Sequence, residues 1–101
     1  MGHRLWLIGG TSESVSLADA IASLGLTCTV TVTTETAQKL YPKTPRVKVQ
    51  VGRLDTEKLD NFLQQQQITA ILDASHPYAV EISQMAIQVA AQQKIPYLRF
   101  E

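Results

Sequence analysis

Leu5-Trp6-Leu7-Ile8-Gly9-Gly10-Thr11-Ser12-Glu13 joins an apolar run to a glycine pair and a polar tripeptide near the start of the chain. A short continuous apolar run is typical of a strand that is buried on both faces. The next segment, 12–24, carries apolar side chains at helical spacing, and Gly25 stands where a helix commonly ends. The stretch therefore predicts a strand, a glycine turn and a helix, which begin a βαβ unit.

Strand-like and helix-like periodicity continue to alternate along the rest of the chain. Further strands are predicted at 27–33, 47–51, 70–72 and 95–100. Helices are predicted at 34–40, at 55–67, and at 79–93 with Pro77 in the first turn of the last one. Strands separated by helices predict a parallel sheet with right-handed crossovers and helices on both faces, which is a three-layer α/β/α fold.

The strand patterns also predict the order of the five strands in the sheet. The first and fourth strands, at 5–8 and 70–72, are continuously apolar, whereas the second and third alternate. Strands buried on both faces belong at the centre, so the order 3-2-1-4-5 of dinucleotide-binding, Rossmann-like domains is favoured. A flavodoxin-like order, 2-1-3-4-5, would bury the third strand with its Lys48 and Gln50, and these two residues argue against it.

Composition limits the class of protein. A chain of 101 residues supports one core, so residues 1–101 are expected to form a single domain. Nine basic and nine acidic side chains give no basic field, which disfavours nucleic-acid binding. Cys28 is the only cysteine, so neither a disulfide nor a cysteine zinc site is expected, and no metal is predicted. Apolar runs are too short for a membrane span or a signal peptide, and the cytoplasm is the expected location.

Ligands of such sheets bind at the carboxyl ends of the strands, near the point where the strand order reverses. Here that point lies between segments 9–13 and 73–78. The glycine pair would bring backbone N–H groups close to a pyrophosphate at the positive end of the first helix, with the Thr11 and Ser12 hydroxyls as further donors. Thr11 and Ser14 stand where the G-x-G-x-x-G fingerprint has glycines, so a simple strand-to-helix turn is the alternative.

Two further segments offer candidate ligand contacts. Glu35 follows the second strand, where an acid commonly binds the adenosine ribose and favours NADH. Thr33, Thr34 and Lys39 lie nearby and could reverse that preference, so NADPH and NADH both remain open; alternatively, Glu35 only begins a surface helix. Arg53 follows the third strand and either pairs with a ligand carboxylate or phosphate or is simply solvated.

The segment after the fourth strand carries the strongest candidates for chemistry. Histidine is a common proton donor and anion ligand, so His76 could donate a proton or bind an anion, or it could serve only in the turn before the helix. Asp73 is either a turn or capping residue or a catalytic acid, and Tyr78 is either a stacking wall or a core residue. Trp6, Phe62 and Cys28 are expected in the core.

Three segments together resemble the precorrin-6A reductase family, including its cobalt-precorrin-6A form. They are Leu7-Ile8-Gly9-Gly10-Thr11-Ser12-Glu13, Asp73-Ala74-Ser75-His76-Pro77-Tyr78-Ala79 and Ile95-Pro96-Tyr97-Leu98-Arg99-Phe100-Glu101. The second is the specific one, because a glycine pair followed by threonine is common. The resemblance covers essentially the whole chain, with the motifs in the same order.

The resemblance implies a reductase of cobalamin biosynthesis that transfers a hydride from NADPH or NADH to a double bond of a tetrapyrrole. Precorrin-6A would become precorrin-6B, with a proton added at the neighbouring carbon. The residues that would hold the dinucleotide are Gly9, Gly10, Thr11 and Glu13. Those that would border the nicotinamide and the substrate are Ser75, His76, Pro77 and Tyr78. Arg53 and His76 would anchor substrate carboxylates, and His76 would donate the proton.

Members of this family resemble longer, two-domain enzymes, so the chain corresponds to their amino-terminal domain. We expect such a domain to bind the cofactor without turning over, and to expose an apolar patch that pairs with the second domain or with another copy. The segment 33–36 lacks the arginine expected in a domain that binds NADPH. A non-catalytic nucleotide-binding or regulatory module is the alternative function, whereas an S-adenosylmethionine methyltransferase would have more glycine in its first loop.

Overall fold

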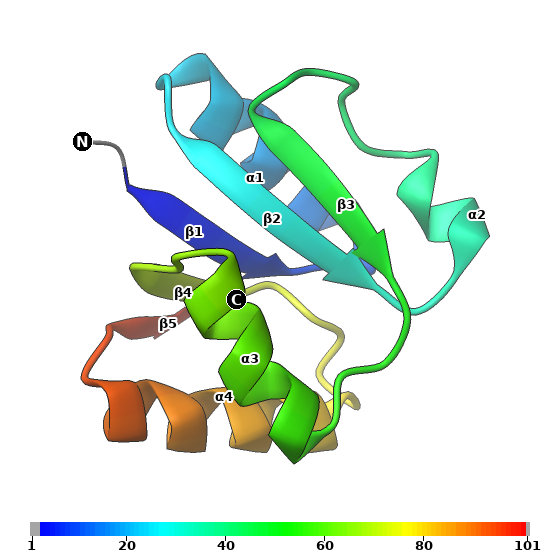
Figure 1. Ribbon diagram of the computed structural model, residues 1–101. Helices are drawn as coiled ribbons and strands as arrows, with labels where there is room; N and C mark the ends of the chain where they lie inside the picture. Colours follow the sequence, from blue (N-terminus) through cyan, green and yellow to red (C-terminus); the bar gives the residue numbers. More distant parts are fainter. Residues whose placement is uncertain (1–2, 101) are drawn as a thin grey trace.

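The computed structural model describes residues 3–100, which form one parallel sheet between two layers of helices (Figure 1). The strands are β1 (Arg4–Ile8), β2 (Thr27–Val32), β3 (Val47–Val51), β4 (Ala70–Asp73) and β5 (Tyr97–Arg99). The helices are α1 (Ser12–Ser23), α2 (Glu35–Gln38), α3 (Thr56–Gln65) and α4 (Val80–Gln93). Met1, Gly2 and Glu101 lie outside the described residues.

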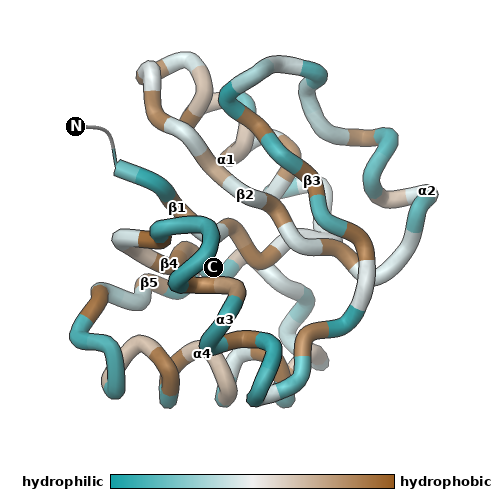
Figure 2. The backbone as a smooth tube through the Cα atoms, viewed as in Figure 1, coloured by the Kyte–Doolittle hydropathy of each residue, from teal (hydrophilic) through white to brown (hydrophobic). Residues whose placement is uncertain are grey.

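The strand order is β3-β2-β1-β4-β5, as predicted, and every pairing is parallel. β1 lies at the centre, paired with both β2 and β4, and the sheet order reverses between β1 and β4. Figure 2 shows hydrophobic residues along β4 and alternating hydrophobic and hydrophilic residues along β3, which lies at the sheet edge. The edge position explains why Lys48 and Gln50 can point to solvent.

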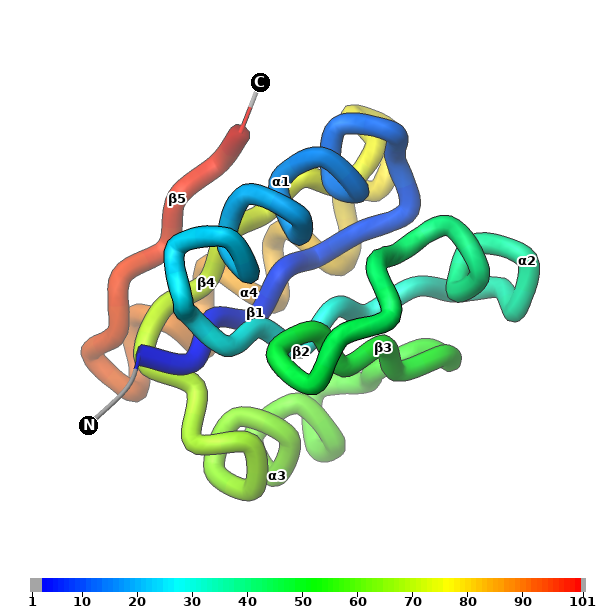
Figure 3. The backbone as a smooth tube through the Cα atoms, turned by 90° about the horizontal axis from the view of Figure 1, so that it is seen from above, coloured from blue at the N-terminus to red at the C-terminus, as the bar shows by residue number. Residues whose placement is uncertain are grey.

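The two faces of the sheet have separate cores, because successive side chains of a strand point to opposite faces. Trp6 and Ile8 of β1 pack with α3 and α4, whereas Leu7 packs with α1. Figure 3 shows α1 and α3 on opposite sides of the strands. The rings of Trp6 and Phe62 pack edge to face with their centroids 5.4 Å apart. The Trp6 indole N–H donates to the Thr31 hydroxyl at 2.9 Å.

Cys28 is fully buried among the residues facing α1, as expected. Burial raises the pKa of its thiol to about 11, since the thiolate would lose its hydration. Trp6 and Phe62 are also buried, so all three residues expected in the core are found there.

The helix predicted at 79–93 is found at Val80–Gln93, but the predicted place of Pro77 in its first turn is wrong. Ala79 is the residue before α4, and its N–H donates to the carbonyl oxygen of His76 at 2.8 Å. That bond closes a separate turn over residues 76–79, so Pro77 lies in the turn and not in the first turn of the helix. β5 is also shorter than the predicted 95–100, because Ile95 donates back to Ala90 of α4 instead of to a strand.

Within residues 3–100, no helix combines the length and the apolar character that crossing a membrane requires. The same residues contain no group of three or more His, Cys, Asp or Glu side chains placed to hold a metal ion.

Candidate functional site

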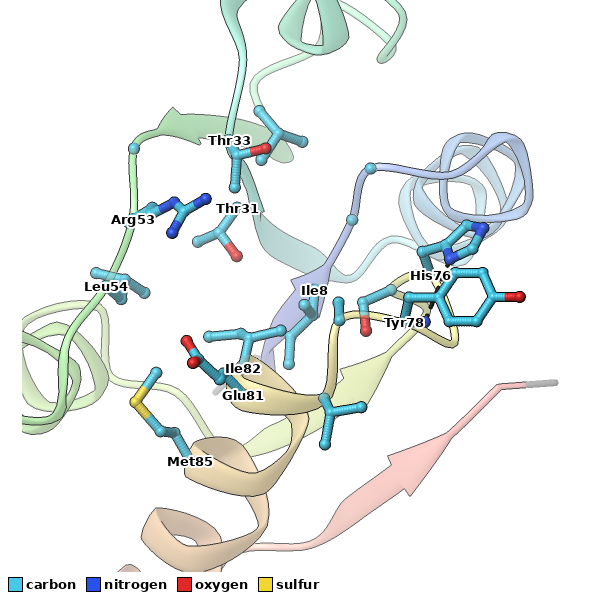
Figure 4. Close-up of a pocket in the computed structure, with 17 residues that line it drawn as sticks. Ile8, Thr31, Thr33, Arg53, Leu54, His76, Tyr78, Glu81, Ile82 and Met85 are labelled. Carbon is cyan, nitrogen blue, oxygen red and sulfur yellow. Dashed lines mark hydrogen bonds between the residues drawn. The ribbon is translucent and has the colours of Figure 1, made fainter.

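A cavity of about 480 Å³ opens at the carboxyl ends of the central strands, next to the start of α4 (Figure 4). Its wall is made by the ends of β1 and β2, the segments after β2, β3 and β4, and the first two turns of α4. The lining side chains that Figure 4 labels are Ile8, Thr31, Thr33, Arg53, Leu54, His76, Tyr78, Glu81, Ile82 and Met85. Gly9, Gly10 and Ser75 also line it. The volume lies in the range of small-molecule sites.

The cavity brings together about half of the residues that the sequence singled out. The predicted residues that line it are Gly9, Gly10, Thr33, Arg53, Ser75, His76 and Tyr78. Those that do not line it are Thr11, Ser12, Glu13, Thr34, Glu35 and Pro77. Thr34 caps α2 by accepting a hydrogen bond from the Ala37 N–H, and Glu35 is the exposed first residue of that helix. The alternative in which Glu35 begins a surface helix therefore describes its place in the structure.

The first glycine of the loop makes room for a tyrosine that sequence reasoning missed. The Gly10 N–H donates to the Tyr41 hydroxyl at 2.9 Å, and this hydroxyl lies 2.6 Å from the Ser14 hydroxyl. A Cβ at Gly9 would collide with the Tyr41 oxygen and with Val30. Gly10, which lines the cavity, has φ +104° and open space around it. Only glycine adopts this backbone conformation easily.

Thr11 explains why this loop departs from the glycine fingerprint. Its hydroxyl accepts from the Ser14 N–H at 3.1 Å, which caps α1, and donates to the Ala74 carbonyl oxygen at 2.7 Å. The Ser14 hydroxyl completes a capping box with the Thr11 N–H. The segments after β1 and β4 are therefore joined directly, as expected for the two sides of the switch point. The first-turn amides of Ser12 and Glu13 have no acceptor within the helix.

The imidazole of His76 is exposed at the end of the cavity opposite Arg53. Its Nδ1 accepts a hydrogen bond from the Tyr78 N–H at 3.2 Å. The centroids of the His76 and Tyr78 rings lie 4.9 Å apart. An Nδ1 that accepts leaves the proton of the neutral ring on Nε2. Tyr78 is 88% exposed, so it is not a core residue, and Figure 4 shows its hydroxyl directed away from the cavity.

Arg53 lines the cavity directly after a tight turn at Gly52. The Gly52 N–H donates to the Val32 carbonyl oxygen at 2.9 Å, and its φ of +129° turns the chain away from β3. The guanidinium extends toward Thr31 and Thr33 in Figure 4. Cationic Arg53 and anionic Glu81 lie on this part of the cavity wall.

Asp73, the last residue of β4, is completely buried beside the site and does not line the cavity. It accepts hydrogen bonds from the Ser75 N–H, the hydroxyls of Ser75 and Ser83, and the phenol of Tyr97. The Arg99 guanidinium pairs with it at 3.1 Å. Burial alone would raise the pKa of Asp73, but the hydrogen bonds from Ser75, Ser83 and Tyr97 outweigh burial and lower it.

Asp73 is thus a turn-forming acid, which was one of the two roles open from the sequence, and it does not cap α4. Sequence reasoning missed its partners Ser83, Tyr97 and Arg99. Burial of Tyr97, followed by its hydrogen bond to Asp73, raises the pKa of the phenol to about 12. The available signal for these contacts was the sequence of β5, which carries Tyr97 and Arg99 and pairs with β4, the strand that ends in Asp73.

The sheet order, the glycine turn and a cavity at the switch point together define a Rossmann-like domain. The solved structure of the Bordetella bronchiseptica enzyme WbmG in complex with NAD shares this fold, with a TM-score of 0.77 at 14% identity, and covers 100% of this chain and 38% of its own. The model of the family described as Precorrin-6x reductase CbiJ/CobK matches residues 4–101, and the chain belongs to this family.

Two relatives illustrate the family membership. The cobalt-precorrin-6A reductase of Synechocystis sp. is 43% identical over 96% of this chain and 37% of its own. The solved structure of CobK precorrin-6A reductase superposes with a TM-score of 0.83 at 26% identity, over 98% of this chain and 39% of its own. The chain therefore spans well under half the length of these relatives.

Proposed function

We propose that this chain is the dinucleotide-binding part of a reductase that reduces precorrin-6A or cobalt-precorrin-6A with NADPH or NADH. The observation that carries the proposal is the cavity between the glycine turn and His76, at the switch point of a chain that belongs to the reductase family. Hydride would pass to one carbon of a macrocycle double bond and a proton to its neighbour, which yields precorrin-6B.

The residues present fit a dinucleotide. Gly10 leaves open space beside the cavity. The first-turn amides of Ser12 and Glu13 stand outside the cavity wall at the positive end of α1, where they would stabilise a pyrophosphate that extends beyond the cavity. Thr33 and Arg53 at the ends of β2 and β3 would border the adenosine. When bound, the cofactor would supply the hydride. The protein would supply the orientation and a site partly closed to water.

His76 would provide the proton. The donor would be the imidazolium form, in which Nδ1 carries a proton and no longer accepts from the Tyr78 N–H, and donation from Nε2 would leave a neutral ring. The adjacent Tyr78 ring is exposed and would form an aromatic wall against the macrocycle. Protonated His76 would also pair with a substrate carboxylate.

Arg53 is the group that supports NADPH over NADH, whereas Glu81 on the same part of the cavity wall would repel a 2′-phosphate. Glu35, the acid that would repel a 2′-phosphate, does not line the cavity, whereas Arg53 does. A guanidinium binds phosphate through charge-assisted hydrogen bonds. A substrate carboxylate is the other anion that Arg53 would bind, and a comparison of the two cofactors separates these roles.

A second domain would close the substrate cleft, since the chain spans only 37% and 39% of the length of the two relatives above. Leu98 on β5, the open edge of the sheet, is 65% exposed, and Phe100 directly after it is 41% exposed. We propose that the second domain covers this edge and that, in its absence, two copies of the chain pair there. Sedimentation at high concentration tests the pairing. We expect the unsubstituted chain to form a dimer and Leu98→Lys to be monomeric, and a strictly monomeric unsubstituted chain would contradict the pairing.

Turnover of precorrin-6A by the complete polypeptide tests the proposed function. We expect NADPH-dependent reduction, and a loss of at least about a hundredfold in kcat for His76→Ala, in the range typical of a missing general acid. His3→Ala is the matched control, because His3 is an exposed histidine away from the cavity. Unchanged turnover of His76→Ala would remove His76 as the proton donor, and absence of any reduction would overturn the reductase assignment.

A further inference from the structure

Directly beside the cavity, five polar residues from β4, the loop after it, α4 and β5 form one hydrogen-bonded network. They are Asp73, Ser75, Ser83, Tyr97 and Arg99. Within this network only Ser75 lines the cavity. Ser75 is therefore the link through which the other members can influence what binds.

The polar atoms of Ser75 are all engaged by two charged side chains. Its N–H and hydroxyl donate to Asp73 Oδ1 at 3.0 and 2.6 Å. Its hydroxyl oxygen accepts from Arg99 Nη1 at 3.2 Å, and its carbonyl oxygen accepts from Arg99 Nη2 at 3.1 Å. This arrangement fixes the backbone that leads directly into His76. It also makes Ser75 a poor ligand donor, because its hydroxyl proton is already bound.

Stability alone does not account for such a network. An ion pair with a buried carboxylate contributes little net free energy compared with well-packed apolar residues, because Asp73 loses all of its hydration and Arg99, whose side chain is 25% exposed, loses much of its own. Apolar side chains between β4 and β5 would hold the two strands together as well. Apolar contacts do not fix the orientation of a backbone segment, whereas hydrogen bonds do. The forked guanidinium of Arg99 binds Asp73 and the Ser75 carbonyl oxygen at once and so fixes the orientation of Ser75.

We propose that Asp73 and Arg99 are positioning residues for dinucleotide binding. By fixing Ser75 from both sides, they hold the turn over residues 76–79 in the conformation in which the Tyr78 N–H meets His76 Nδ1. The cavity end that would receive the nicotinamide is thereby preformed. This inference rests on the proposed function for its ligand, but the geometry of His76 tests it without any ligand.

Arg99→Lys is the most informative variant, because it keeps the charge beside Asp73 and loses the fork. Arg46→Lys is the matched control: Arg46 also donates from Nη1 to a backbone carbonyl, that of Gly25, but it lies outside the cavity. We expect Arg99→Lys to bind NADPH about tenfold more weakly, which is the effect of about 1.4 kcal/mol. Arg46→Lys should bind like the unsubstituted chain.

Imidazole ¹⁵N NMR supplies a readout that a purely structural role would not change. The neutral ring of His76 should carry its proton on Nε2 in the unsubstituted chain and in Arg46→Lys, and should become a mixture of both tautomers in Arg99→Lys. Ser75→Ala, which removes only the hydroxyl, should shift binding and the His76 spectrum in the same direction and serves if Arg99→Lys folds poorly.

Two results separate the inference from the proposed function. An unchanged His76 spectrum and unchanged NADPH affinity in folded Arg99→Lys and Ser75→Ala would overturn the positioning role, even if both variants unfold at lower temperature. Failure of the unsubstituted chain to bind NADPH or NADH would contradict the proposed function. The His76 tautomer would still support or overturn the positioning role in that case.

Discussion

The Thr11 hydroxyl donates to the Ala74 carbonyl oxygen at 2.7 Å, which joins the turn after β1 to the turn after β4 across the switch point of the sheet. The same hydroxyl accepts from the Ser14 N–H and caps α1. One side chain thus fixes both the start of the first helix and the distance between the two segments that border the cavity.

Replacing Thr11 by valine should lower the free energy of unfolding by about 2 kcal/mol, about 1 for the lost cap and about 1 for the lost bridge. NADPH affinity should fall as well. Thr34→Val is the matched control, because Thr34 caps α2 in the same way without bridging to another segment. Urea denaturation and NADPH titration measure both effects; equal losses in the two variants would contradict the bridging role.

The close approach of Gly9 and Tyr41 predicts a coupled pair of substitutions. Gly9→Ala should cost about 1–3 kcal/mol, because the new methyl group would overlap the Tyr41 hydroxyl. Tyr41→Phe removes the overlapping atom, so Gly9→Ala should cost less in that background. Gly25→Ala, which meets no neighbour within 4 Å, should have the same cost in both backgrounds. Additive effects of Gly9→Ala and Tyr41→Phe in urea denaturation would refute this packing.

Arg53→Gln should separate the two cofactors. If Arg53 binds a 2′-phosphate, the variant loses a charge-assisted contact and should bind NADPH about tenfold more weakly, while its affinity for NADH stays the same. Lys48→Gln is the control, because Lys48 is exposed on β3 outside the cavity. An equal loss of affinity for NADPH and NADH would instead assign Arg53 to the adenine or to another group that the two cofactors share.

Acid should destabilise the domain partly through Asp73. Its pKa is lowered by folding, so its ionised form stabilises the fold above the unfolded value of about 3.9, and this stabilisation is lost as pH falls through the lower, folded pKa. Asp73→Asn should therefore flatten the acid limb of the stability profile below about pH 4. Asp60→Asn, at an exposed carboxylate bonded to Gln93, is the control. Identical acid limbs in thermal unfolding of Asp73→Asn and the unsubstituted chain would contradict this role.

The fold followed from the sequence because it depends on patterns that are local or that differ between strands. Continuous apolar runs placed β1 and β4 at the centre, and the alternation around Lys48 and Gln50 placed β3 at an edge. The place of Pro77 was mispredicted because a hydrogen bond from the Ala79 N–H to the His76 carbonyl oxygen, which composition does not indicate, closes a separate turn before α4.

The site was less accessible to sequence reasoning, because its supporting contacts join residues far apart in the chain. The two segments at the switch point were found because the fold brings strand ends together. Tyr41 below the glycine pair and Arg99 beside Asp73 were missed, since the bonds Gly10 to Tyr41 and Arg99 to Asp73 depend on how the loops pack. Glu35 was placed at the ribose by analogy with other dinucleotide folds, and the four-residue α2 carries it outside the cavity wall.

Titration of the purified chain with NADPH and, separately, with NADH tests the central claim most directly, with nicotinamide fluorescence as the signal. The account predicts saturable binding, tighter for NADPH, that His3→Ala leaves unchanged and that Thr11→Val weakens. If neither cofactor binds while another nucleotide such as ATP does, the domain is a nucleotide-binding module of a different kind, and the assignment of this cavity to a reduced nicotinamide is contradicted.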